Sequence, residues 1–336
     1  MVGVAVGGVV GFYFYHRITR DMPKIEKLSD YRPKAVTRVF ADDGKLIGEL
    51  YDDERRYPVE FKDIPIRLRQ AILSAEDADF YKHPGVDLRS ILRAMWVNFR
   101  HKSSKQGAST ITQQVVKSLL LSREKTYERK AKEAILAYRL EQGLTKDEIL
   151  SIYLNEIFLG NTAYGVKAAA RVHFRKELDQ LTLGEMAYIA GLPPKPSELA
   201  NPRNREEALG RRNYVLQQML IHGYITAEEK KSAEAEDLKI YPADSRKIFA
   251  APYYVNHVEK LLEEKFGKKY LNPGGFDVYT AASVAANDLA TRSLRRGIKE
   301  IDKRRGWLGP IASVSMPKKA ISDLLDAQAV ASKVGI

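Results

Sequence analysis

The sequence predicts a mainly α-helical fold, with a small β-hairpin before the helices and a mixed α and β region after them. Apolar residues recur at helical spacing between residues 64 and 223, where the sequence also carries patterns typical of helix N-termini. Before this stretch, two alternating segments flank Asp43-Gly44, which indicates two short strands joined by a tight turn. The chain has 336 residues, of which 44% are hydrophobic and 29% charged, enough for about two domains of ordinary globular composition.

Within residues 1–16, positions 2–15 are an uncharged apolar run that stops abruptly at His16-Arg17. The run is shorter than the roughly 20 residues that a complete membrane span needs. It also lacks the basic start and the cleavage site of a signal peptide. We expect a transmembrane anchor that is clipped at its start, with residues 12–15 as an interfacial aromatic belt. A buried core strand is the alternative.

Two regions follow the anchor. Residues 17–62 are expected to be a linker that contains the β-hairpin, with strands over 35–41 and 45–51. Residues 63–223 are expected to be the helical domain, because capping-box patterns open helices and glycines are placed to end them. The patterns begin at Thr110, Thr145, Thr182 and Thr226, and the glycines are Gly143, Gly191 and Gly223.

The last part of the chain, residues 224–336, is expected to be a linker followed by the incomplete start of an α+β region. We expect a helix over 253–266, a strand over 275–281 and a helix over 287–303. No internal repeat and no low-complexity tract interrupts the sequence.

The composition narrows the classes of function. A formal net charge of +12 suits an anionic partner, such as nucleic acid, an acidic membrane surface or a phosphorylated substrate. The absence of cysteine excludes a disulfide scaffold, a cysteine nucleophile and Cys-ligated metal sites. The six histidines show no zinc-ligand spacing, and no nucleotide-binding fingerprint or recognised nucleic-acid motif occurs.

The first candidate site is an acidic cluster at the end of a predicted helix. Glu76, Asp77, Asp79 and His83 fall within eight residues and are followed by a Pro-Gly turn. A helix C-terminus disfavours negative charge, so the cluster is costly unless it has a function. It is either a solvated helix end or a general acid/base carboxylate held in a cleft. Because acidic neighbours raise a carboxyl pKa, we expect a raised pKa for Glu76.

The second candidate site is the segment Gly-Ala-Ser-Thr-Ile-Thr-Gln-Gln over 107–114. Hydroxyl residues at a helix start leave backbone N–H groups pointing outward, which is a favourable arrangement for phosphate. A well-capped helix alone would explain Ser109 and Thr110 but not the paired amides of Gln113 and Gln114.

The third candidate site is Arg-Lys-Ala-Lys-Glu over 129–133, where one carboxylate borders a basic belt. Nine Lys or Arg residues but only two acidic residues occur from Arg100 to Lys132. An ordinary surface ion pair between Arg129 and Glu133 is the simplest explanation. A pyrophosphate-handling site would need the same pattern, since cations offset leaving-group charge and the carboxylate could hold a divalent metal.

Two further segments carry small residues and turns. Tyr-Leu-Asn over 153–155 is followed by Gly160 and Gly165, and Ala-Gly-Leu-Pro-Pro-Lys-Pro-Ser spans 190–197. Each segment alone would be assigned to the core or to a stiff loop.

In this order and at these separations, the five segments resemble the glycosyltransferase module of the class A penicillin-binding proteins (glycosyltransferase family 51). The resemblance covers about residues 60–220. It implies a lysozyme-like, mostly helical fold. It also implies an enzyme that polymerises lipid II into β-1,4 glycan with inversion, releasing undecaprenyl pyrophosphate.

The resemblance also implies roles for individual residues. Glu76 would be the general base that deprotonates the acceptor's 4-hydroxyl. Glu133 would assist departure of the lipid pyrophosphate, directly or as a ligand of a divalent cation, Mg²⁺ or Mn²⁺. Lys125 stands where many members have arginine, which keeps the charge but loses the bidentate geometry. The substrate-binding residues would be Asp77, Phe80, His83, Ser109, Thr110, Gln113, Gln114, Lys117, Lys125, Arg129, Lys130, Lys132, Tyr153 and Asn155.

The family places the catalytic domain on the periplasmic side of the bacterial inner membrane, behind a single-pass anchor. Arg17 and Arg20, taken alone, would favour a cytoplasmic location, and we follow the family here. The implied partners are lipid II, the growing glycan, the cytoplasmic membrane and other cell-wall synthesis proteins, with no nucleic acid. Ser315 and Lys318 match a Ser-x-x-Lys pattern without its two companion motifs, so we expect no transpeptidase activity from this chain.

Two other functions stay open on the sequence alone. A lysozyme-like hydrolase or lytic enzyme would share the fold and a catalytic glutamate, but cleavage of neutral glycan has no pyrophosphate leaving group and no need for the basic belt. A membrane-tethered, non-catalytic wall-binding scaffold would have no need for both Glu76 and Glu133.

Overall fold

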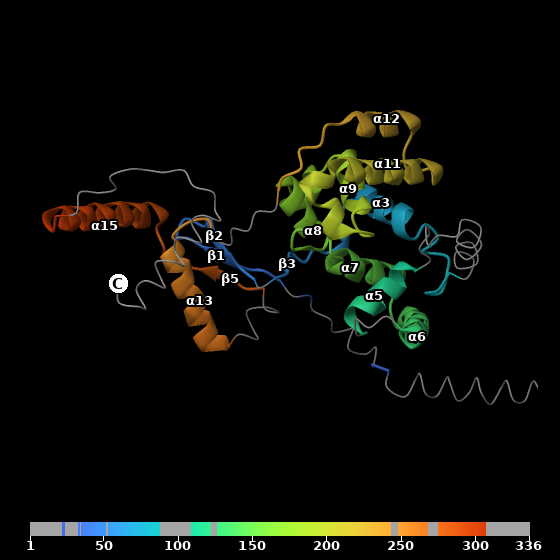
Figure 1. Ribbon diagram of the computed structural model, residues 1–336. Helices are drawn as coiled ribbons and strands as arrows, with labels where there is room; N and C mark the ends of the chain where they lie inside the picture. Colours follow the sequence, from blue (N-terminus) through green and yellow to red (C-terminus); the bar gives the residue numbers. More distant parts are fainter. Residues whose placement is uncertain are drawn as a thin grey trace, which may run out of the picture. The chain divides into compact units, whose positions relative to one another are not determined.

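In a computed structural model of the chain, the structure describes residues 22–23, 33, 35–51, 53–87, 109–121, 126–242, 248–267 and 275–306. The chain divides after Ala281 into two compact units, and each is described by itself (Figure 1). The anchor predicted over 1–16 lies outside the described residues, as do Lys125 and Ser315. Within the described ranges, no helix combines the length and the apolar character that a membrane crossing requires.

The predicted β-hairpin forms, with β1 (Thr37–Phe40) antiparallel to β2 (Leu46–Leu50). Gly44 in the connecting turn has a φ of +76°, a conformation that glycine adopts without steric cost. The strand β5 (Asp277–Tyr279) pairs with the other edge of β1 in parallel, so the sheet order is β2-β1-β5. A strand from the end of the first unit therefore completes the sheet of the hairpin, a pairing that local sequence patterns do not predict.

The helix α13 (Pro252–Phe266) accompanies this sheet and packs against β2 (Figure 1). Val255 and Val258 are its buried residues. Arg38 of β1 donates two hydrogen bonds, of 2.7 and 2.6 Å, to the carboxylate of Asp277 on β5. This bidentate ion pair joins the two strands from distant parts of the sequence.

The first unit is mainly helical, as the sequence predicts, and its helical domain follows the hairpin. Its α-helices are α3 (Ile66–Glu76), α5 (Ile111–Leu119), α6 (Tyr127–Gly143), α7 (Lys146–Glu156), α8 (Val166–Ala169), α9 (Leu183–Gly191), α10 (Pro196–Leu199), α11 (Arg205–Ile221) and α12 (Ala227–Ala235). Short 3-10 turns lie at Phe61–Asp63, Leu178–Gln180 and Pro202–Asn204, and a π-helical turn lies at Ala170–Phe174.

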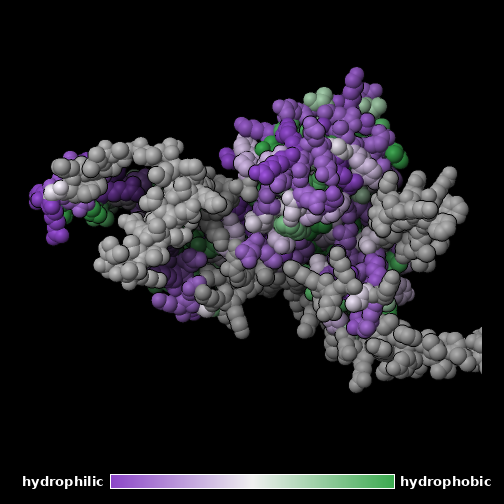
Figure 2. All heavy atoms as spheres, viewed as in Figure 1, coloured by the Kyte–Doolittle hydropathy of each residue, from purple (hydrophilic) through white to green (hydrophobic). Residues whose placement is uncertain are grey.

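The packing places α9 at the centre of the helical domain. This helix is buried along almost its whole length, and both α3 and α11 pack against it. On another side, α5 packs against α6 and α7. The face of the domain visible in Figure 2 is mainly hydrophilic, as expected when the apolar side chains fill the interior.

All four predicted capping boxes form. Thr110, Thr145, Thr182 and Thr226 each accept a hydrogen bond from the backbone N–H three residues later. In turn, the side-chain oxygen of the Gln or Glu at that third position accepts a hydrogen bond from the backbone N–H of the threonine. The helix starts therefore follow from contacts within four residues, which explains why they are predictable from sequence.

A second, two-stranded sheet was not predicted. Arg55–Arg56 (β3), in the expected linker, pairs in parallel with Ala163–Tyr164 (β4), in the expected helical domain. Two-residue strands are too short to produce an alternating pattern. Both arginines are buried, and Arg56 forms a 2.5 Å ion pair with Glu156 at the end of α7.

The second unit, by itself, contains the helix α15 (Val284–Arg304), which confirms the helix predicted over 287–303 and begins three residues earlier. The side chain of Ser283 caps its N-terminus by accepting from the backbone N–H of Ala286. Leu289, Leu294, Ile298 and Ile301 are exposed on this helix.

Candidate active site

Glu76 is the last residue of α3, and its side chain reaches α5. Its Oε2 accepts a 2.9 Å hydrogen bond from Nε2 of Gln114. Gln113, the neighbouring glutamine, is buried, and its Oε1 accepts from the backbone N–H of Thr110 in the capping box. The two paired amides therefore have different uses: Gln113 caps α5, and Gln114 faces the first candidate site.

Burial raises the pKa of Glu76 and is the largest influence on it. The hydrogen bond from Gln114 and the positive charge of Arg211 on α11 lower this pKa, and Asp77 adds a smaller upward effect. The predicted direction is confirmed, but the main cause is loss of water rather than the acidic neighbours. A raised carboxyl pKa suits a proton acceptor that works near neutral pH.

Asp77 and His83 hold the turn that follows Glu76. Both are buried, and Nε2 of His83 lies 3.0 and 3.1 Å from the two carboxylate oxygens of Asp77. Asp77 Oδ2 also accepts a 2.9 Å hydrogen bond from the backbone N–H of Ile111, the first residue of α5. These two residues, predicted to bind substrate, are used in the structure to fix the start of α5 against the end of α3.

The same turn is locked onto α5 and α6 at Gly85. Thr110, another predicted substrate-binding residue, donates a 2.6 Å hydrogen bond to the carbonyl of Gly85. Gly85 has a φ of +89°, and a Cβ at this position would lie 2.7 Å from the carbonyl oxygen of Ala137 on α6. Only glycine allows the turn to approach the helix backbone this closely.

The side chains of Phe80 and Asn155 are engaged in contacts within the protein. Phe80 is fully buried in the hydrophobic core, with Nζ of Lys146 lying 4.4 Å from its ring centroid. The amide of Asn155 is hydrogen-bonded within the protein: Oδ1 accepts from Val59 N–H at 2.9 Å, and Nδ2 donates to the carbonyls of Val59 and Ser151. Both residues were predicted to bind substrate. In the structure Phe80 packs in the core, and Asn155 binds the backbone of Val59 and Ser151.

Tyr153 lies closer to the catalytic candidate. It is 2% exposed, and its hydroxyl donates a 3.5 Å hydrogen bond to Oε1 of Gln114. Burial raises the pKa of Tyr153 well above its usual value, and the charges of Glu76 and Asp77 act in the same direction. The phenol therefore stays protonated and orients the amide of Gln114, whose other end donates to Glu76.

Glu133 is the second candidate carboxylate, and it lies on α6 with 2% exposure. Its Oε1 is 2.5 Å from a terminal guanidinium nitrogen of Arg129, and its Oε2 is 2.8 Å from Nζ of Lys130. The predicted Arg129–Glu133 pair is present, but the carboxylate is buried rather than part of a solvated helix face. Lys130 also donates a 2.8 Å hydrogen bond to Oγ of Ser109, just before α5.

The segment 109–114 therefore connects both carboxylates. Ser109 reaches Glu133 through Lys130, and Gln114 reaches Glu76 directly. The remaining described cations of the basic belt lie nearby in sequence: Lys117 is exposed on α5, and Lys132 pairs with Glu128 at 3.3 Å. One short segment thus reaches two different carboxylates. Glu76 is desolvated, and Glu133 is paired with two cations.

The described residues around Glu133 do not by themselves complete a divalent-cation site. Among the described residues, no group of three or more histidine, aspartate or glutamate side chains is placed to hold a metal ion. Both oxygens of Glu133 are already engaged by Arg129 and Lys130. Mg²⁺ usually keeps several waters and binds one or two carboxylates together with substrate phosphates, so Glu133 would hold it only together with the pyrophosphate and after releasing one of its two cations.

Arg211 is a residue of this site that the sequence analysis missed. Its guanidinium carbon lies 4.5 Å from the ring centroid of Tyr214, and its charge lowers the pKa of Glu76. A Cβ on Gly191 would lie 3.3 Å from the backbone of Arg211, so the absence of a side chain there lets α9 and α11 approach closely. No local pattern links Arg211 to Glu76, because only the packing of α11 against α3 brings them together.

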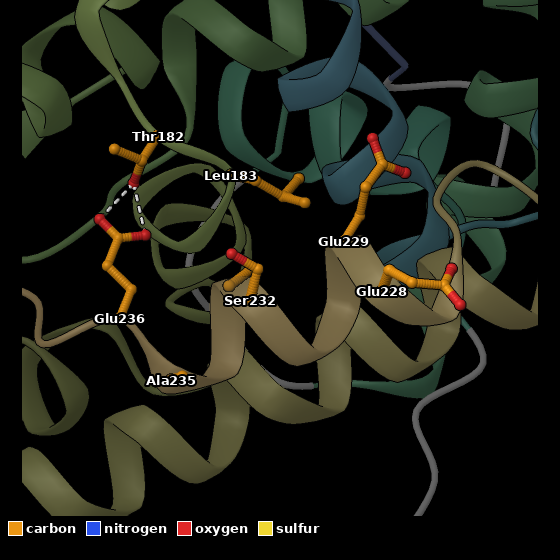
Figure 3. Close-up of a pocket in the computed structure, with 8 residues that line it drawn as sticks. Thr182, Leu183, Glu228, Glu229, Ser232, Ala235 and Glu236 are labelled. Atoms are coloured by element: carbon orange, nitrogen blue, oxygen red, sulfur yellow. Dashed lines mark hydrogen bonds between the residues drawn. The ribbon is translucent and has the colours of Figure 1, made fainter.

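A separate hollow of about 840 Å³ lies between the start of α9 and α12 (Figure 3). Thr182, Leu183, Glu228, Glu229, Ser232, Ala233, Ala235 and Glu236 line it. Thr182 donates to the carboxylate of Glu236 at 2.7 and 2.9 Å across one end of the hollow, and Glu229 pairs with Arg67 at 3.1 Å. None of the lining residues is a predicted site residue, and the acidic lining is unsuited to an anionic substrate.

Comparison with known proteins identifies the family. The family model described as transglycosylase matches residues 43–220, a range that contains both candidate carboxylates and the five motifs. The chain belongs to the transglycosylase family. This membership confirms the resemblance inferred from the motifs.

Named relatives of this transglycosylase family member are penicillin-binding proteins. Penicillin-binding protein 1A of Rickettsia felis is 42% identical over 313 residues, which are 92% of this chain and 39% of that protein. Penicillin-binding protein 1A of Escherichia coli is 40% identical over 307 residues, which are 91% of this chain and 36% of that protein. A crystal structure of penicillin-binding protein 1A from Haemophilus influenzae matches with a TM-score of 0.47 and 28% identity, covering 88% of this chain and 35% of that chain. The chain spans about two fifths of the length of the curated relatives it matches.

Proposed function

We propose that this transglycosylase family member is a peptidoglycan glycosyltransferase that polymerises lipid II into β-1,4 glycan and releases undecaprenyl pyrophosphate. The family membership and the penicillin-binding protein relatives support this class of enzyme. The observation that carries the proposal is the different environment of the two carboxylates that the segment 109–114 reaches: Glu76 is desolvated, and Glu133 is held by two cations.

In this mechanism Glu76 is the general base. It accepts the proton of the acceptor's 4-hydroxyl as that oxygen attacks the anomeric carbon of the donor sugar. The new glycosidic bond forms while the bond from the anomeric carbon to the pyrophosphate oxygen breaks, so a single displacement inverts the configuration. Gln114 holds the carboxylate of Glu76 through its 2.9 Å hydrogen bond, and burial raises the pKa of Glu76, which favours its acceptance of the proton.

The leaving group is an anionic pyrophosphate, and the basic residues beside the segment 109–114 offset its developing charge. Arg129 and Lys130 are held in place by the buried Glu133, and Lys117 is exposed on the neighbouring helix. Glu133 acts here as a fixed anion that orients cations. This role of Glu133 needs no metal ion, because Arg129 and Lys130 already engage both of its oxygens.

We infer that the chain acts at the outer surface of the bacterial cytoplasmic membrane, where its lipid substrate is located. Residues 1–16 would be a single-pass anchor, and other cell-wall synthesis proteins and the growing glycan would be its partners. The lipid-linked substrate and the apolar composition of residues 1–16 support this location.

The test is incubation of labelled lipid II with the detergent-solubilised chain, followed by separation of products by size. We expect glycan chains that lysozyme digests, together with released undecaprenyl pyrophosphate. The Glu76→Gln variant is the matched control and should lose turnover by about 10²–10⁴-fold while still binding a phosphoglycolipid inhibitor. Release of hydrolysed disaccharide alone would indicate a hydrolase, and binding without any product from the wild type would indicate a scaffold.

A further inference from the structure

Glu141 and Lys146 form an ion pair that none of the five motifs contains. Glu141 lies near the end of α6, and Lys146 is the first residue of α7. Nζ of Lys146 is 2.7 Å from the carboxylate, and the side chain of Glu141 is only 6% exposed. A buried ion pair is a poor source of stability unless its remaining donors and acceptors are satisfied.

This pair also forms hydrogen bonds to α5, which carries Gln114, and to the turn that follows Glu76. Glu141 Oε1 accepts a 2.6 Å hydrogen bond from the hydroxyl of Thr112, in the first turn of α5. Lys146 Nζ donates a 2.7 Å hydrogen bond to the backbone carbonyl of His83, in the turn after α3. The ion pair therefore holds α5 on one side and the turn after Glu76 on the other.

These contacts close a ring. From Lys146 the ring passes through His83 to Asp77, which is adjacent to Glu76 in the chain. From Glu141 it passes through Thr112 along α5 to Gln114. The ring closes at the 2.9 Å hydrogen bond between Gln114 and Glu76. The ion pair therefore acts beside the Asp77–Ile111 and Thr110–Gly85 hydrogen bonds in holding α5 against the turn, and its displacement is expected to change the separation of Gln114 and Glu76.

We propose that the Glu141–Lys146 pair is a positioning device that sets the distance between Gln114 and the catalytic carboxylate of Glu76. The proposal rests on the proposed function, in which Glu76 is the general base. An apolar pair of similar volume could fill the same space, but it could not hold the hydroxyl of Thr112 and the carbonyl of His83. Neither Glu141 nor Lys146 needs to touch the substrate for this role.

The positioning role predicts a particular change in the pKa of Glu76. The charged and titratable groups that act on it are Asp77 after α3, Tyr153 on α7 and Arg211 on α11, together with the amide of Gln114 on α5. The hydrogen bond from Gln114 lowers the pKa of Glu76. When the ion pair is broken and Gln114 withdraws, the pKa of Glu76 rises further, so the acid limb of the activity profile moves to higher pH.

The experiment compares Glu141→Gln and Lys146→Met with the wild-type chain in lipid II polymerisation between pH 5 and pH 9. We expect kcat to fall about tenfold or more in both variants, since small misplacements of catalytic groups cost rates of this order. We expect KM to change less than kcat, and the acid limb to shift upward. Thermal unfolding of each variant measures its loss of stability separately.

The matched control is Glu185→Gln, which breaks another ion pair with a buried glutamate. Nζ of Lys176 lies 2.8 Å from Glu185, whose side chain is 5% exposed, and this pair has no bond to the ring around Glu76. We expect Glu185→Gln to lower stability without moving the acid limb. If Glu141→Gln lowers the rate equally at every pH, as a general loss of folded protein would, the positioning proposal is wrong.

A second readout separates the two proposals. The carboxyl carbon of Glu76, labelled with ¹³C and assigned with Glu76→Gln, titrates without any substrate. We expect its titration to move to higher pH in Glu141→Gln. An unchanged titration overturns the positioning role, whereas a wild-type chain that cannot polymerise lipid II overturns the proposed function alone.

Discussion

Nε2 of Gln114 on α5 donates a 2.9 Å hydrogen bond to Oε2 of Glu76 at the end of α3. This contact joins the acidic cluster to the Gln-Gln motif, which are separated in the chain by the region 88–108 that lies outside the described residues. It also explains how a desolvated carboxylate keeps a defined orientation, because the amide of Gln114 is in turn held by the hydroxyl of Tyr153.

Replacing Arg211 by Gln is predicted to raise the pKa of Glu76. The positive charge of Arg211 lowers this pKa in the wild type, so its removal leaves the effect of burial less opposed. The base is then protonated up to a higher pH, and the acid limb of kcat/KM for lipid II polymerisation should move upward, with the rate recovered at alkaline pH.

The control for this prediction is Arg211→Lys, which keeps the charge and should keep most of the wild-type profile. Arg212→Gln is a second comparison, since Arg212 donates to the backbone carbonyls of Glu234 and Glu236 and stabilises the end of α12. It should lower stability without shifting the limb. Identical pH profiles for Arg211→Gln and the wild type would rule out Arg211 as an influence on the base.

Replacing Glu133 by Gln is predicted to cut turnover without changing the response to Mg²⁺. The variant loses the anion that holds Arg129 and Lys130, so these cations no longer oppose the charge of the leaving pyrophosphate in a fixed geometry. Loss of a preorganised electrostatic group of this kind commonly costs about 10²–10³-fold in kcat.

The measurement is the polymerisation rate against Mg²⁺ concentration for the wild type and Glu133→Gln. Parallel curves are expected, because Arg129 and Lys130 already engage both oxygens of Glu133. A metal response that is present in the wild type and lost in the variant would instead identify Glu133 as a ligand.

His173 is predicted to make the helical domain less stable below neutral pH. It is fully buried, its Nε2 donates a 2.9 Å hydrogen bond to the carbonyl of Leu159, and burial lowers its pKa from 6.5 to about 4. The unfolded chain therefore binds a proton between about pH 6.5 and 4 that the folded chain does not. The stability contribution is complete above pH 6.5 and is lost as the pH falls toward 4, by about 3 kcal/mol at most.

Urea unfolding of the wild type and His173→Gln at several pH values between 4 and 7 checks this prediction. The variant should be less stable at pH 7, because it disturbs a buried site, but its free energy of unfolding should fall less on acidification. Equal slopes in the two proteins would show that His173 is not the group that titrates.

Gly85→Ala is predicted to destabilise the domain more than Gly44→Ala. Both glycines have positive φ, +89° and +76°, so both substitutions strain the backbone by about 1–2 kcal/mol. At Gly85 the new Cβ would also lie 2.7 Å from the backbone of α6, whereas nothing lies within 4 Å at Gly44. The collision should add about 1–3 kcal/mol.

Thermal and urea unfolding of the two variants measure the difference, and polymerisation assays should show a loss of activity for Gly85→Ala alone. The activity loss is expected because the turn at Gly85 is hydrogen-bonded to Thr110 at the start of α5. Equal destabilisation by the two variants would contradict a close approach of the turn to α6.

The sequence by itself determined the features that depend on neighbouring residues. The capping boxes beginning at Thr110, Thr145, Thr182 and Thr226 are each closed within four residues, so the local pattern is sufficient to predict them. The hairpin around Gly44 is equally local. The motif residues also fixed the family, because their types and spacings are independent of how the helices pack.

Tertiary structure decided which side chains meet. Gln113 belongs to the local cap that begins at Thr110, but only the direction in which α5 packs against α3 brings its neighbour Gln114 to Glu76. The parallel pairing of β5 with β1, the charge of Arg211 near Glu76 and the Glu141–Lys146 ring all join distant segments. Such contacts form only when the hydrophobic core has brought the helices together, and no pattern within a short window of sequence encodes them.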